Sequence, residues 1–440
     1  MKKRLLLCLT YLCLTHCGST LAQGNTLTVE RYGHLPFRET PFADIRGSYP
    51  MTEGESRTRK HFELTKDPEG RVIEMKFKQG EKVVPLNVSR NAVTHSSHVK
   101  IRYEGNQEIR TYFDTEGNPT LANGVYKSVF TLDNYGNRTS LSFMDFEGKQ
   151  IESSWGVYRY DWTVDKRGTV TEQRFDKTGK PVSIRPGFPF YCLKLHYDQR
   201  GLLALMENYG LDCKQLTLNE LNGAQDKLEY DDRGSMIAWN VYDDKEQRSA
   251  GNGPKVARGL MTPDVYGNTI REYYQDPDGQ PMTSAYGWTD TYAEFDAHGN
   301  MTSRFNFDTK GKLLNNPTLG YAGYRLTYDD KGLNRLTLEY FDEDNQPAVH
   351  QSRGYHAVKH HYDNAGRVSH ISFLDVEGQL VNRVDRCFAE LHYAYDELGR
   401  RVKVSLTDKD GMPVKDCRQD WTETHYEYYP NGPLKNTTRK

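Results

Sequence analysis

Hydrophobic and polar residues alternate along short runs of this sequence, and tight turns that contain glycine separate the runs. The stretch from Tyr362 to Gly378 shows the pattern in full, with one turn closing at Gly366 and a second at its end. In the run between the turns, Ile371 and Phe373 fall on the same side of the chain, as the two-residue period of a β-strand requires. The pattern therefore predicts β-hairpins and not helices.

The same pattern recurs at an almost constant interval along the chain. The glycines that close the first turn of each copy are Gly70, Gly105, Gly136, Gly168, Gly201, Gly234, Gly267, Gly299, Gly332, Gly366, Gly399 and Gly432. Neighbours in this series are 31 to 35 residues apart, and most are 33 apart. A fixed period of this size is typical of stacked supersecondary units. The sequence therefore predicts a tandem β-hairpin repeat array across residues 61–440.

Aspartate and glycine occupy fixed positions in these turns. An Asp three residues before the glycine accepts hydrogen bonds from turn amides, and the glycine tolerates a positive φ. The clearest pairs are Asp198 with Gly201, Asp231 with Gly234, Asp329 with Gly332, Asp363 with Gly366, and Asp396 with Gly399. A second turn of the same kind follows in most units, with a proline two residues beyond it at Pro119, Pro181, Pro281, Pro347 and Pro413. We therefore expect two firm strands per unit and a proline-bearing connection with room for a third, shorter one.

The predicted fold is all-β, an elongated twisted antiparallel array, solenoid-like, of ~33-residue β-hairpin repeats. A propeller is the alternative, although this period is short for a four-stranded blade. The middle of the array, residues 186–259, is irregular, because its second turn has decayed at Asp243 and residues 211–221 look inserted. That segment is either an insertion that makes a binding surface or drift without a role. Residues 23–60 show no sustained period, and we expect an irregular N-terminal tether or cap.

The N-terminus has the features of an export signal. Basic residues 2–4 precede an apolar run at 5–14, and small residues before Gln23 offer a cleavage site after Ala22. Surface lipoprotein anchoring at Cys17 is the less favoured alternative, because a histidine precedes it where a small residue is normal. The run is too short to span a bilayer, and no later stretch is apolar for long enough. We therefore predict a 22-residue signal peptide and a periplasmic or secreted protein with no membrane span.

Removal of that leader leaves four cysteines, Cys192, Cys213, Cys387 and Cys417. An even number of cysteines in an oxidising compartment favours disulfides. Cys387 and Cys417 are 30 residues apart, close to one repeat, so neighbouring units could place them side by side. Cys192 and Cys213 flank the irregular copy. We predict bridges 192–213 and 387–417, with four buried thiols as the alternative.

The charge balance says little about a ligand, except that it disfavours nucleic acid. The chain has 58 Lys and Arg against 60 Asp and Glu, a formal net charge of -2, and no basic block or stripe. Hydrophobic residues are only 36%, whereas Tyr numbers 30. A thin repetitive sheet, which buries little per unit, needs large amphipathic side chains of this kind.

The Tyr-Asp-x-x-Gly turns resemble a known repeat family. Five copies carry the motif, at Tyr197–Gly201, Tyr230–Gly234, Tyr328–Gly332, Tyr362–Gly366 and Tyr395–Gly399. They resemble the YD repeats of Rhs-type bacterial surface and toxin proteins, and the terminal Tyr-Tyr-Pro-Asn-Gly that ends at Gly432 looks like a MORN-type unit. The first resemblance implies antiparallel hairpins and an extracellular scaffold, sometimes a shell around a toxin. The period is longer than YD spacing, and we carry over the scaffold and not toxin delivery.

No catalytic signature is present in the sequence, so we predict no catalytic residue, no metal site and no cofactor. The histidines nearest to a metal-ligating set are His356, His360 and His370, which make a metal-dependent hydrolase the third hypothesis. Acidic turns such as Asp276–Gly279 suit turn stabilisation better than calcium, which gathers six or more oxygens.

The aromatic residues leave two functions open. Trp155, Trp162, Trp239, Trp288 and Trp421 either form the core of the array or present ring faces to a glycan. We favour the core, and hence a non-catalytic scaffold of the bacterial envelope or surface that binds a protein partner. A glycan-binding surface protein is the alternative.

Overall fold

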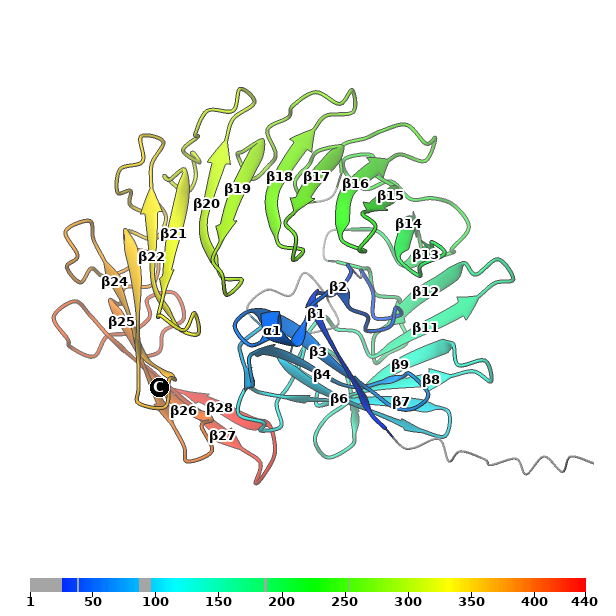
Figure 1. The fold of residues 1–440 in the computed structure, drawn as a ribbon, viewed down its shortest axis with the longest axis horizontal. Helices are drawn as coiled ribbons and strands as arrows, with labels where there is room; N and C mark the ends of the chain where they lie inside the picture. Colours follow the sequence, from blue (N-terminus) through cyan, green and yellow to red (C-terminus); the bar gives the residue numbers. More distant parts are fainter. Residues whose placement is uncertain (1–25, 38, 87–95, 186–187, 252) are drawn as a thin grey trace, which may run out of the picture.

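The computed structural model describes residues 26–37, 39–86, 96–185, 188–251 and 253–440, and its elements are almost all β-strands (Figure 1). These residues form one 28-stranded antiparallel sheet that remains open. The N-terminal elements are β1 (Thr28–His34), β2 (Ser48–Pro50), α1 (Glu53–Ser56), β3 (Lys60–Lys66), β4 (Val72–Gln79), β5 (Lys82–Val83), β6 (His98–Glu104) and β7 (Gln107–Phe113). The next strands are β8 (Lys127–Leu132), β9 (Arg138–Met144), β10 (Gln150–Ile151), β11 (Arg159–Val164), β12 (Val170–Phe175), β13 (Cys192–Tyr197), β14 (Leu203–Tyr209), β15 (Gln225–Tyr230), β16 (Met236–Tyr242), β17 (Arg258–Pro263) and β18 (Thr269–Gln275). The sheet ends with β19 (Asp290–Phe295), β20 (Met301–Phe307), β21 (Gly323–Tyr328), β22 (Arg335–Phe341), β23 (Ala357–Tyr362), β24 (Val368–Leu374), β25 (Glu390–Tyr395), β26 (Arg401–Thr407), β27 (Glu423–Tyr428) and β28 (Leu434–Arg439).

This architecture confirms the predicted array of β-hairpins. Each unit contributes two long strands joined by its first turn, and the second strand pairs with the first strand of the next unit, as Ile371 of β24 does with Leu391 of β25. The proline after the second turn forms the expected short extra pairing, for example between Pro413 and Thr407. One continuous ladder runs through all units, so the propeller alternative, which would need separate blades, is wrong.

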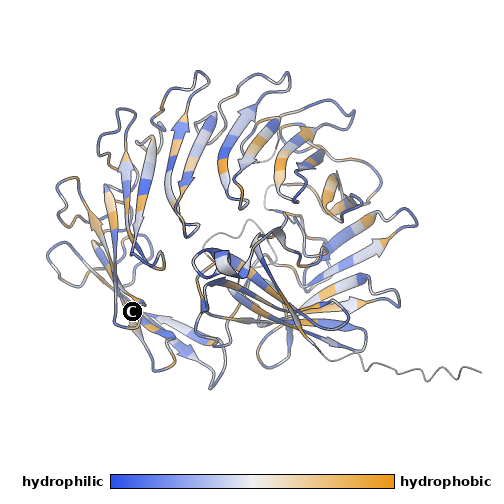
Figure 2. Ribbon diagram, in the orientation of Figure 1, coloured by the Kyte–Doolittle hydropathy of each residue, from blue (hydrophilic) through white to orange (hydrophobic). Residues whose placement is uncertain are grey.

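Alternation along the strands gives the sheet one apolar face. In β23 and β24 the opposed residues Val358 and Phe373 lie on that face, whereas Lys359 and Ser372 lie on the other. Hydrophobic colour accordingly falls mainly on the strands in Figure 2, and the turns are mostly hydrophilic. No helix among the described residues has the length and apolar character needed to cross a bilayer.

Residues 28–37 and 39–60, which we call the N-terminal hub, lie at the centre of the curved array (Figure 1). β1 pairs with both β2 and β3, so the hub belongs to the same sheet. Leu35 and Ile45 of the hub are buried in the core cluster on the apolar face of the first units. The ring of Phe42 packs edge-on against Trp162, with 5.6 Å between ring centroids. The hub therefore covers the apolar face of the N-terminal half of the array.

In several units a tyrosine that stands just before the first turn links the unit to the one before it. The hydroxyl donates to a backbone carbonyl 27 residues earlier in five pairs: Tyr230 to Leu203, Tyr328 to Met301, Tyr362 to Arg335, Tyr395 to Val368 and Tyr428 to Arg401. In every pair the acceptor is the first residue of the preceding unit's second strand. This hydrogen bond explains why an aromatic residue with a hydroxyl recurs at that position.

Candidate functional site

The first turns have the geometry that the Asp and Gly residues predict. Asp363 Oδ1 accepts the amides of Ala365 and Arg367, each at 2.9 Å, and Gly366 has a φ of 77°. Both features are those of a tight turn followed by a left-handed residue. The aspartate side chain thus accepts hydrogen bonds from turn amides, which is the turn-stabilising role that the sequence favours over calcium binding.

The other predicted turns follow this geometry with one variation. Asp198, Asp231 and Asp396 accept the amides two and four residues onward, and Gly201, Gly234 and Gly399 all have positive φ. Asp329 instead accepts the amides of Leu333 and Asn334, because its loop carries one more residue before the second strand. Gly332 still has a φ of 66°.

Hydrogen bonding also sets the charge state of several turn carboxylates. Burial alone would raise the pKa of Asp363, but the amide and the guanidinium of Arg367 outweigh it and hold the pKa below its ordinary value. The same opposition lowers the pKa of Asp198, through Leu202 and Arg200, and that of Asp396, through Arg400. These turns therefore favour ionised aspartates.

The first turns point inward and contact the hub. The hydroxyl of Tyr49 donates to the carboxylate of Asp231, and Arg59 donates to the carbonyl of Ala297 at 2.8 Å. The Arg59 guanidinium also lies 3.6 Å from the centroid of the Tyr266 ring. Gln79, just beyond the hub, donates to the carbonyl of Lys331 at 2.6 Å. The repeat turns are thus used for contacts within the molecule.

The last units contact the second turns of early units. Asn118 donates to the carbonyl of Leu398 at 2.9 Å, across 280 residues of sequence. The rings of Phe146 and Tyr429 are 4.9 Å apart. The array therefore curves until its C-terminal units pack against its N-terminal ones, although the hydrogen-bonded ladder does not close.

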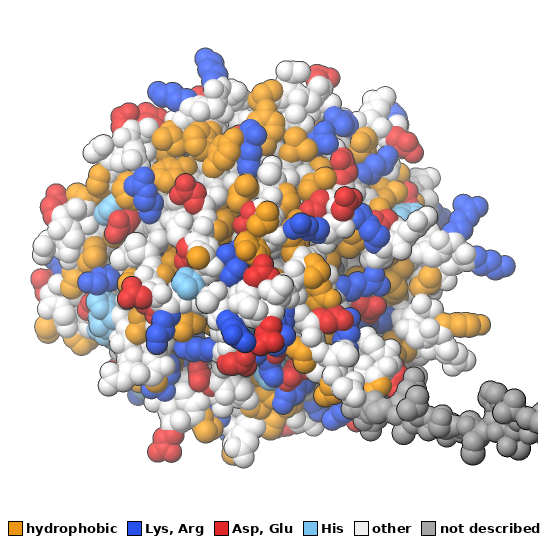
Figure 3. All heavy atoms as spheres, in the orientation of Figure 1, with side chains coloured by type: hydrophobic (Ala, Val, Ile, Leu, Met, Phe, Trp, Pro, Cys, Tyr) orange, Lys and Arg blue, Asp and Glu red, His pale blue; other side chains and the backbone are white. Residues whose placement is uncertain are grey.

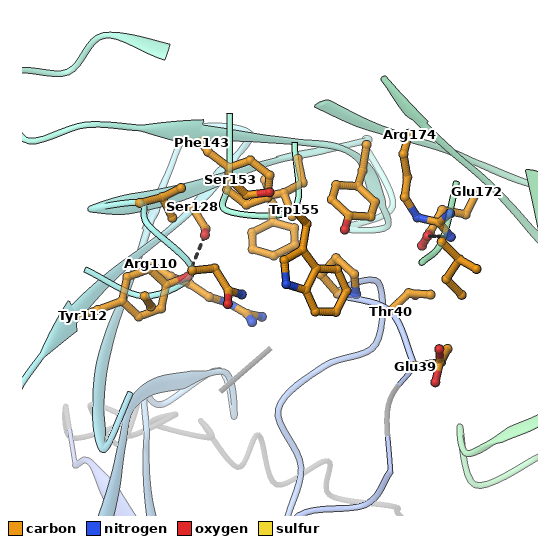
Figure 4. A pocket seen from close by; sticks show the side chains of 18 residues that line it. Glu39, Thr40, Arg110, Tyr112, Ser128, Phe143, Ser153, Trp155, Glu172 and Arg174 are labelled. Atoms are coloured by element: carbon orange, nitrogen blue, oxygen red, sulfur yellow. Dashed lines mark hydrogen bonds and ion pairs between the residues drawn. The ribbon is translucent and has the colours of Figure 1, made fainter. Parts of the chain in front are cut away.

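A small cavity of about 50 Å³ lies between the hub and the apolar face (Figure 4). Arg110 and Arg174 line it and pair with Glu108 at 2.6 Å and Glu172 at 2.7 Å. Burial would raise the pKa of Glu108, but Arg110 and Arg138 outweigh it and lower that pKa. The Nη1 atoms of Arg110 and Arg174 have no hydrogen-bond partner among the described residues. The cavity has room for a few water molecules that would satisfy them, so it belongs to a buried polar network that supports the hub.

Both predicted disulfides are present. Cys192 bonds to Cys213 and Cys387 to Cys417, with Cα atoms 5.5 and 5.6 Å apart. The second bridge joins two consecutive connecting loops, as the near-repeat spacing of its cysteines predicts. The amide of Cys417 also donates to the carbonyl of Arg386 at 3.2 Å.

The second turns and connecting loops form what we call the outer rim, on the outside of the curve in Figure 1. Each late rim loop donates an amide to the loop before it, Gln351 to Leu319 at 2.8 Å and Val384 to Arg353 at 3.0 Å. The rim is therefore cross-braced by its own hydrogen bonds, independently of the strands.

Large apolar side chains are exposed on this rim. Val349, Val376, Val384 and Met412, from three consecutive units, expose between 42% and 65% of their surface. Isolated exposed apolar residues are ordinary, but a succession along a braced edge is typical of a contact surface. These residues were not predicted from the sequence, where each appears only as an apolar residue inside or next to an otherwise polar turn or loop.

The structure does not bring together His356, His360 and His370. His356 is buried and contacts the carbonyl of Ala348 at 3.0 Å, whereas Arg335 donates to Nε2 of His360 at 2.9 Å. No group of three or more metal-ligating side chains is found among the described residues. The histidine grouping that the third hypothesis would need is therefore absent from the described residues.

A different histidine set lies on the polar face. His361 stacks on His370 with ring centroids 3.8 Å apart, and His370 stacks on His392 at 5.5 Å. A bulge between His361 and Tyr362 shifts the register, so that His370 stands opposite His361. Strand alternation did place His361 on the opposite face from His360, but the pairing register was needed to find its neighbour.

Of the tryptophans, Trp162 and Trp421 are buried in the core, the position that the sequence favours, whereas Trp155 exposes 49% of its surface.

Lys and Arg are interspersed with Asp and Glu on the face drawn in Figure 3. The expected leader, its cleavage after Ala22 and the alternative anchor at Cys17 lie outside the described residues.

The fold and the inward-facing turns define the chain as a tandem β-hairpin repeat protein with an N-terminal hub. No family model matches it, and no curated protein matches it. Among solved structures it is similar to a crystal structure of TcdB2-TccC3-Cdc42, with 12% identity and a TM-score of 0.28, over 93% of this chain and 24% of that one.

It is also similar to the Tc holotoxin pore of Photorhabdus luminescens, with 13% identity and a TM-score of 0.26, over 90% of this chain and 21% of that one. A porin-like protein from Bacteroides uniformis has 9% identity and a TM-score of 0.18, over 86% of this chain and 93% of that one. The chain spans about a quarter of the length of the first of these structures. Its function therefore has to be argued from its own geometry.

Proposed function

We propose that the protein is an exported, non-catalytic scaffold that binds a protein partner through its outer rim. The observation that carries this proposal is the row of exposed apolar residues, Val349, Val376, Val384 and Met412, on a rim whose loops are already fixed. A surface that is ordered before binding loses little conformational entropy when a partner docks. Exposed apolar groups supply the hydrophobic centre that protein interfaces share.

The C-terminal part of the rim is also fixed by a covalent bond and an ion pair. The Cys387–Cys417 disulfide joins two of its loops, and Arg386 donates to the fully buried Asp416 at 2.5 Å. Disulfides persist in oxidising compartments, so the two bridges support export, together with the leader features of the sequence.

A double substitution tests the rim. The test variant carries both Val376→Asp and Val384→Asp, which add two charges to the proposed contact surface. The control is Val265→Asp, which adds a charge at a residue that is 69% exposed but lies on a first turn, away from the rim. The melting temperature of each purified variant is measured first, to show that it folds. Each variant is then expressed in the native host, cross-linked to its partners in the intact cells and purified. We expect a partner that the wild type and Val265→Asp retain and the rim variant loses. Recovery of the same partners by all three proteins would contradict a rim site.

A glycan is the second candidate ligand, favoured by exposed rings on the same rim. Trp155 is half exposed, and Tyr286 is exposed beside Trp288, with 5.6 Å between ring centroids. Such ring faces suit sugar stacking. Binding to a glycan array that is abolished by Trp155→Ala, with the rim-valine variant unaffected, would favour this candidate over the protein partner.

A further inference from the structure

We propose that the cavity under the hub binds a small monovalent anion, of the size of chloride, against the buried guanidinium of Arg110. Arg110 is 1% exposed and pairs with Glu108 through its Nε and Nη2 atoms, at 2.7 and 2.6 Å. Its Nη1 atom has no hydrogen-bond partner within the part of the chain that the structure describes. A buried N–H group without an acceptor costs free energy, so an acceptor inside the cavity would stabilise this arrangement.

A pair of hydroxyl groups supplies a second donor beside Arg110. The Tyr112 hydroxyl and Ser128 Oγ are 2.6 Å apart, both side chains are buried, and both line the cavity. The two groups carry two protons and the bond between them uses one, so the other proton is available to an acceptor in the cavity. Ser128 of β8 stands opposite Arg110 of β7, which places the hydroxyl pair next to the guanidinium.

The buried charges at this end of the cavity do not balance. Glu108 accepts hydrogen bonds from both Arg110 and Arg138, and all three residues are at most 5% exposed. A further carboxylate, that of Asp44, lies 2.9 Å from Arg138, but its side chain is 62% exposed and water screens its charge. The buried groups therefore carry one more positive than negative charge. Water would satisfy the donors without balancing that charge, whereas a monovalent anion does both.

The two carboxylates that line the cavity belong to its other end. Glu172 pairs with Arg174 at 2.7 Å, and Glu39 pairs with Arg185. Glu172 lies on β12, which is separated from β7 by β8, β9 and β11 in the ladder, or by roughly 19 Å between backbones. Figure 4 shows Arg110 on one side of Trp155, and Arg174 and Glu172 on the other. An anion at Arg110 would thus be remote from Glu172.

The size of the cavity limits the ligand, and its position gives the ligand a role. A volume of about 50 Å³ admits an ion of the size of chloride together with water, but not an organic anion of six carbons. Thr40 and Pro41 of the hub also line the cavity, so the ion would lie between the hub and the array. Binding that requires the docked hub stabilises the folded protein by mass action. The site is separate from the rim, so the inference does not depend on the proposed function.

A direct test uses bromide, which replaces chloride and scatters anomalously. Crystals of the full chain are soaked in sodium bromide, and the anomalous difference map is calculated. We expect a peak in the cavity, within hydrogen-bond distance of Arg110 Nη1 and of the hydroxyl pair. Bromide peaks on the outer surface alone would overturn the inference.

Thermal unfolding tests the site in solution. Sodium chloride is titrated against sodium gluconate at constant ionic strength and pH 7. We expect chloride to raise the melting temperature of the wild type saturably, by about 2 to 4 °C. A control titration that raises the concentration of gluconate alone should not reproduce this rise, because gluconate is too large for the cavity.

A double substitution connects the chloride effect to the hydroxyl pair. Tyr112→Phe combined with Ser128→Ala removes both hydroxyls together, which leaves no partner unsatisfied and preserves the fold. We expect the chloride concentration at half-saturation to increase by about tenfold or more, because a hydrogen bond to a charged group is lost. The matched control is Thr327→Val combined with Thr337→Val, which removes another hydroxyl pair, 2.7 Å apart, from β21 and β22. It should respond to chloride as the wild type does.

Three results in solution would also overturn the inference. The first is a melting temperature that chloride does not change at constant ionic strength, since water alone would then fill the cavity. The second is an equal response of the wild type and the Tyr112 and Ser128 double variant. The third is an equal rise in gluconate, which would show a general effect of salt. A bromide peak in the crystal without a saturable shift in solution would mean binding at crystal concentration only.

Discussion

The hydroxyl of Tyr49 donates a hydrogen bond to the carboxylate of Asp231, across 182 residues of sequence. Tyr49 belongs to the hub and is 3% exposed, and Asp231 belongs to the first turn of a repeat near the middle of the array. Burial, followed by the bond to Asp231, raises the pKa of Tyr49 to about 12, so the hydroxyl keeps its proton at neutral pH. The Tyr49 side chain thus joins the N-terminal hub to a repeat unit in the middle of the array.

Removal of that hydroxyl tests whether the hub stabilises the array. We expect Tyr49→Phe to lower the free energy of unfolding by about 1 to 2 kcal/mol, because Asp231 loses a hydrogen-bond donor. Urea unfolding followed by tyrosine and tryptophan fluorescence measures the change. Tyr135→Phe is the matched control, since Tyr135 is 91% exposed, and it should leave stability unchanged. Equal effects of the two substitutions would mean that the contact contributes nothing.

A second prediction concerns a decayed turn. Glu246 stands where other second turns have glycine, yet it keeps the left-handed backbone, with a φ of 61°. Asp243 still accepts the amides of Lys245 and Gln247, each at 2.8 Å, so the turn has kept its geometry without its glycine. Glycine adopts this φ without strain, and we expect Glu246→Gly to stabilise the protein by about 1 kcal/mol.

The reverse substitution is the control for this prediction. Gly378 has a φ of 80° and no neighbouring atom within 4 Å of an added Cβ, so Gly378→Ala introduces backbone strain without a clash. We expect a loss of about 1 kcal/mol, measured by thermal unfolding of both variants. A Glu246→Gly protein that melts at or below the wild-type temperature would refute the strain argument.

These turns show why much of the fold could be predicted from the sequence. The conformation around Asp363 and Gly366 is decided within five residues, by a side-chain oxygen and a residue free to adopt positive φ. The 387–417 disulfide followed from the period, because neighbouring units bring positions one repeat apart together. Local chemistry and a constant period are both visible in one sequence.

The hub contacts could not be predicted in this way. Nothing near Tyr49 indicates Asp231, because the contact depends on the curvature accumulated over several units. The neighbours of the histidines could not be predicted for a related reason. His370 meets His361 and not His360, since a single bulge before Tyr362 changes which residues stand opposite each other. Register and curvature are properties of the assembled sheet.

The third prediction is a loss of stability in mild acid. Burial, followed by the charges of Arg335 and His361, lowers the pKa of His360 to about 4, and burial followed by Arg353 lowers that of His350 to about 4. Both values lie below the ~6.5 of a histidine in an unfolded chain. The unfolded state therefore binds more protons between these pH values, so stability is complete above about pH 6.5 and falls as the pH drops toward 4.

His360→Gln separates this effect from other acid-sensitive groups. Glutamine still accepts a hydrogen bond from Arg335, which His360 accepts at 2.9 Å, but it does not titrate. We expect its melting temperature to fall less than that of the wild type between pH 7 and pH 4.5. The turn aspartates with lowered pKa act at lower pH, because their stabilisation is present above the unfolded value of ~3.9. A wild-type melting temperature that is constant from pH 7 to pH 5 would contradict the prediction.

The last prediction concerns the bridge that joins two rim loops. The Cys387–Cys417 disulfide closes a 30-residue interval, and replacement of both cysteines by serine should lower the free energy of unfolding by about 2 to 4 kcal/mol. Because the strands on either side keep their own ladder, from Ser372 with Glu390 to Ser405 with Glu423, the variant should retain its fold. The rim amide of Cys417, which bonds to Arg386 in the wild type, should then exchange faster as a serine amide, while that of Leu406 stays protected. Serine at Cys192 and Cys213 is the matched control, since it removes a bridge of 21 residues at the irregular copy and should leave exchange at the C-terminal rim unchanged. Equal exchange at residue 417 with and without the 387–417 bridge would show that hydrogen bonds alone fix the rim, and that the disulfide does not order this surface.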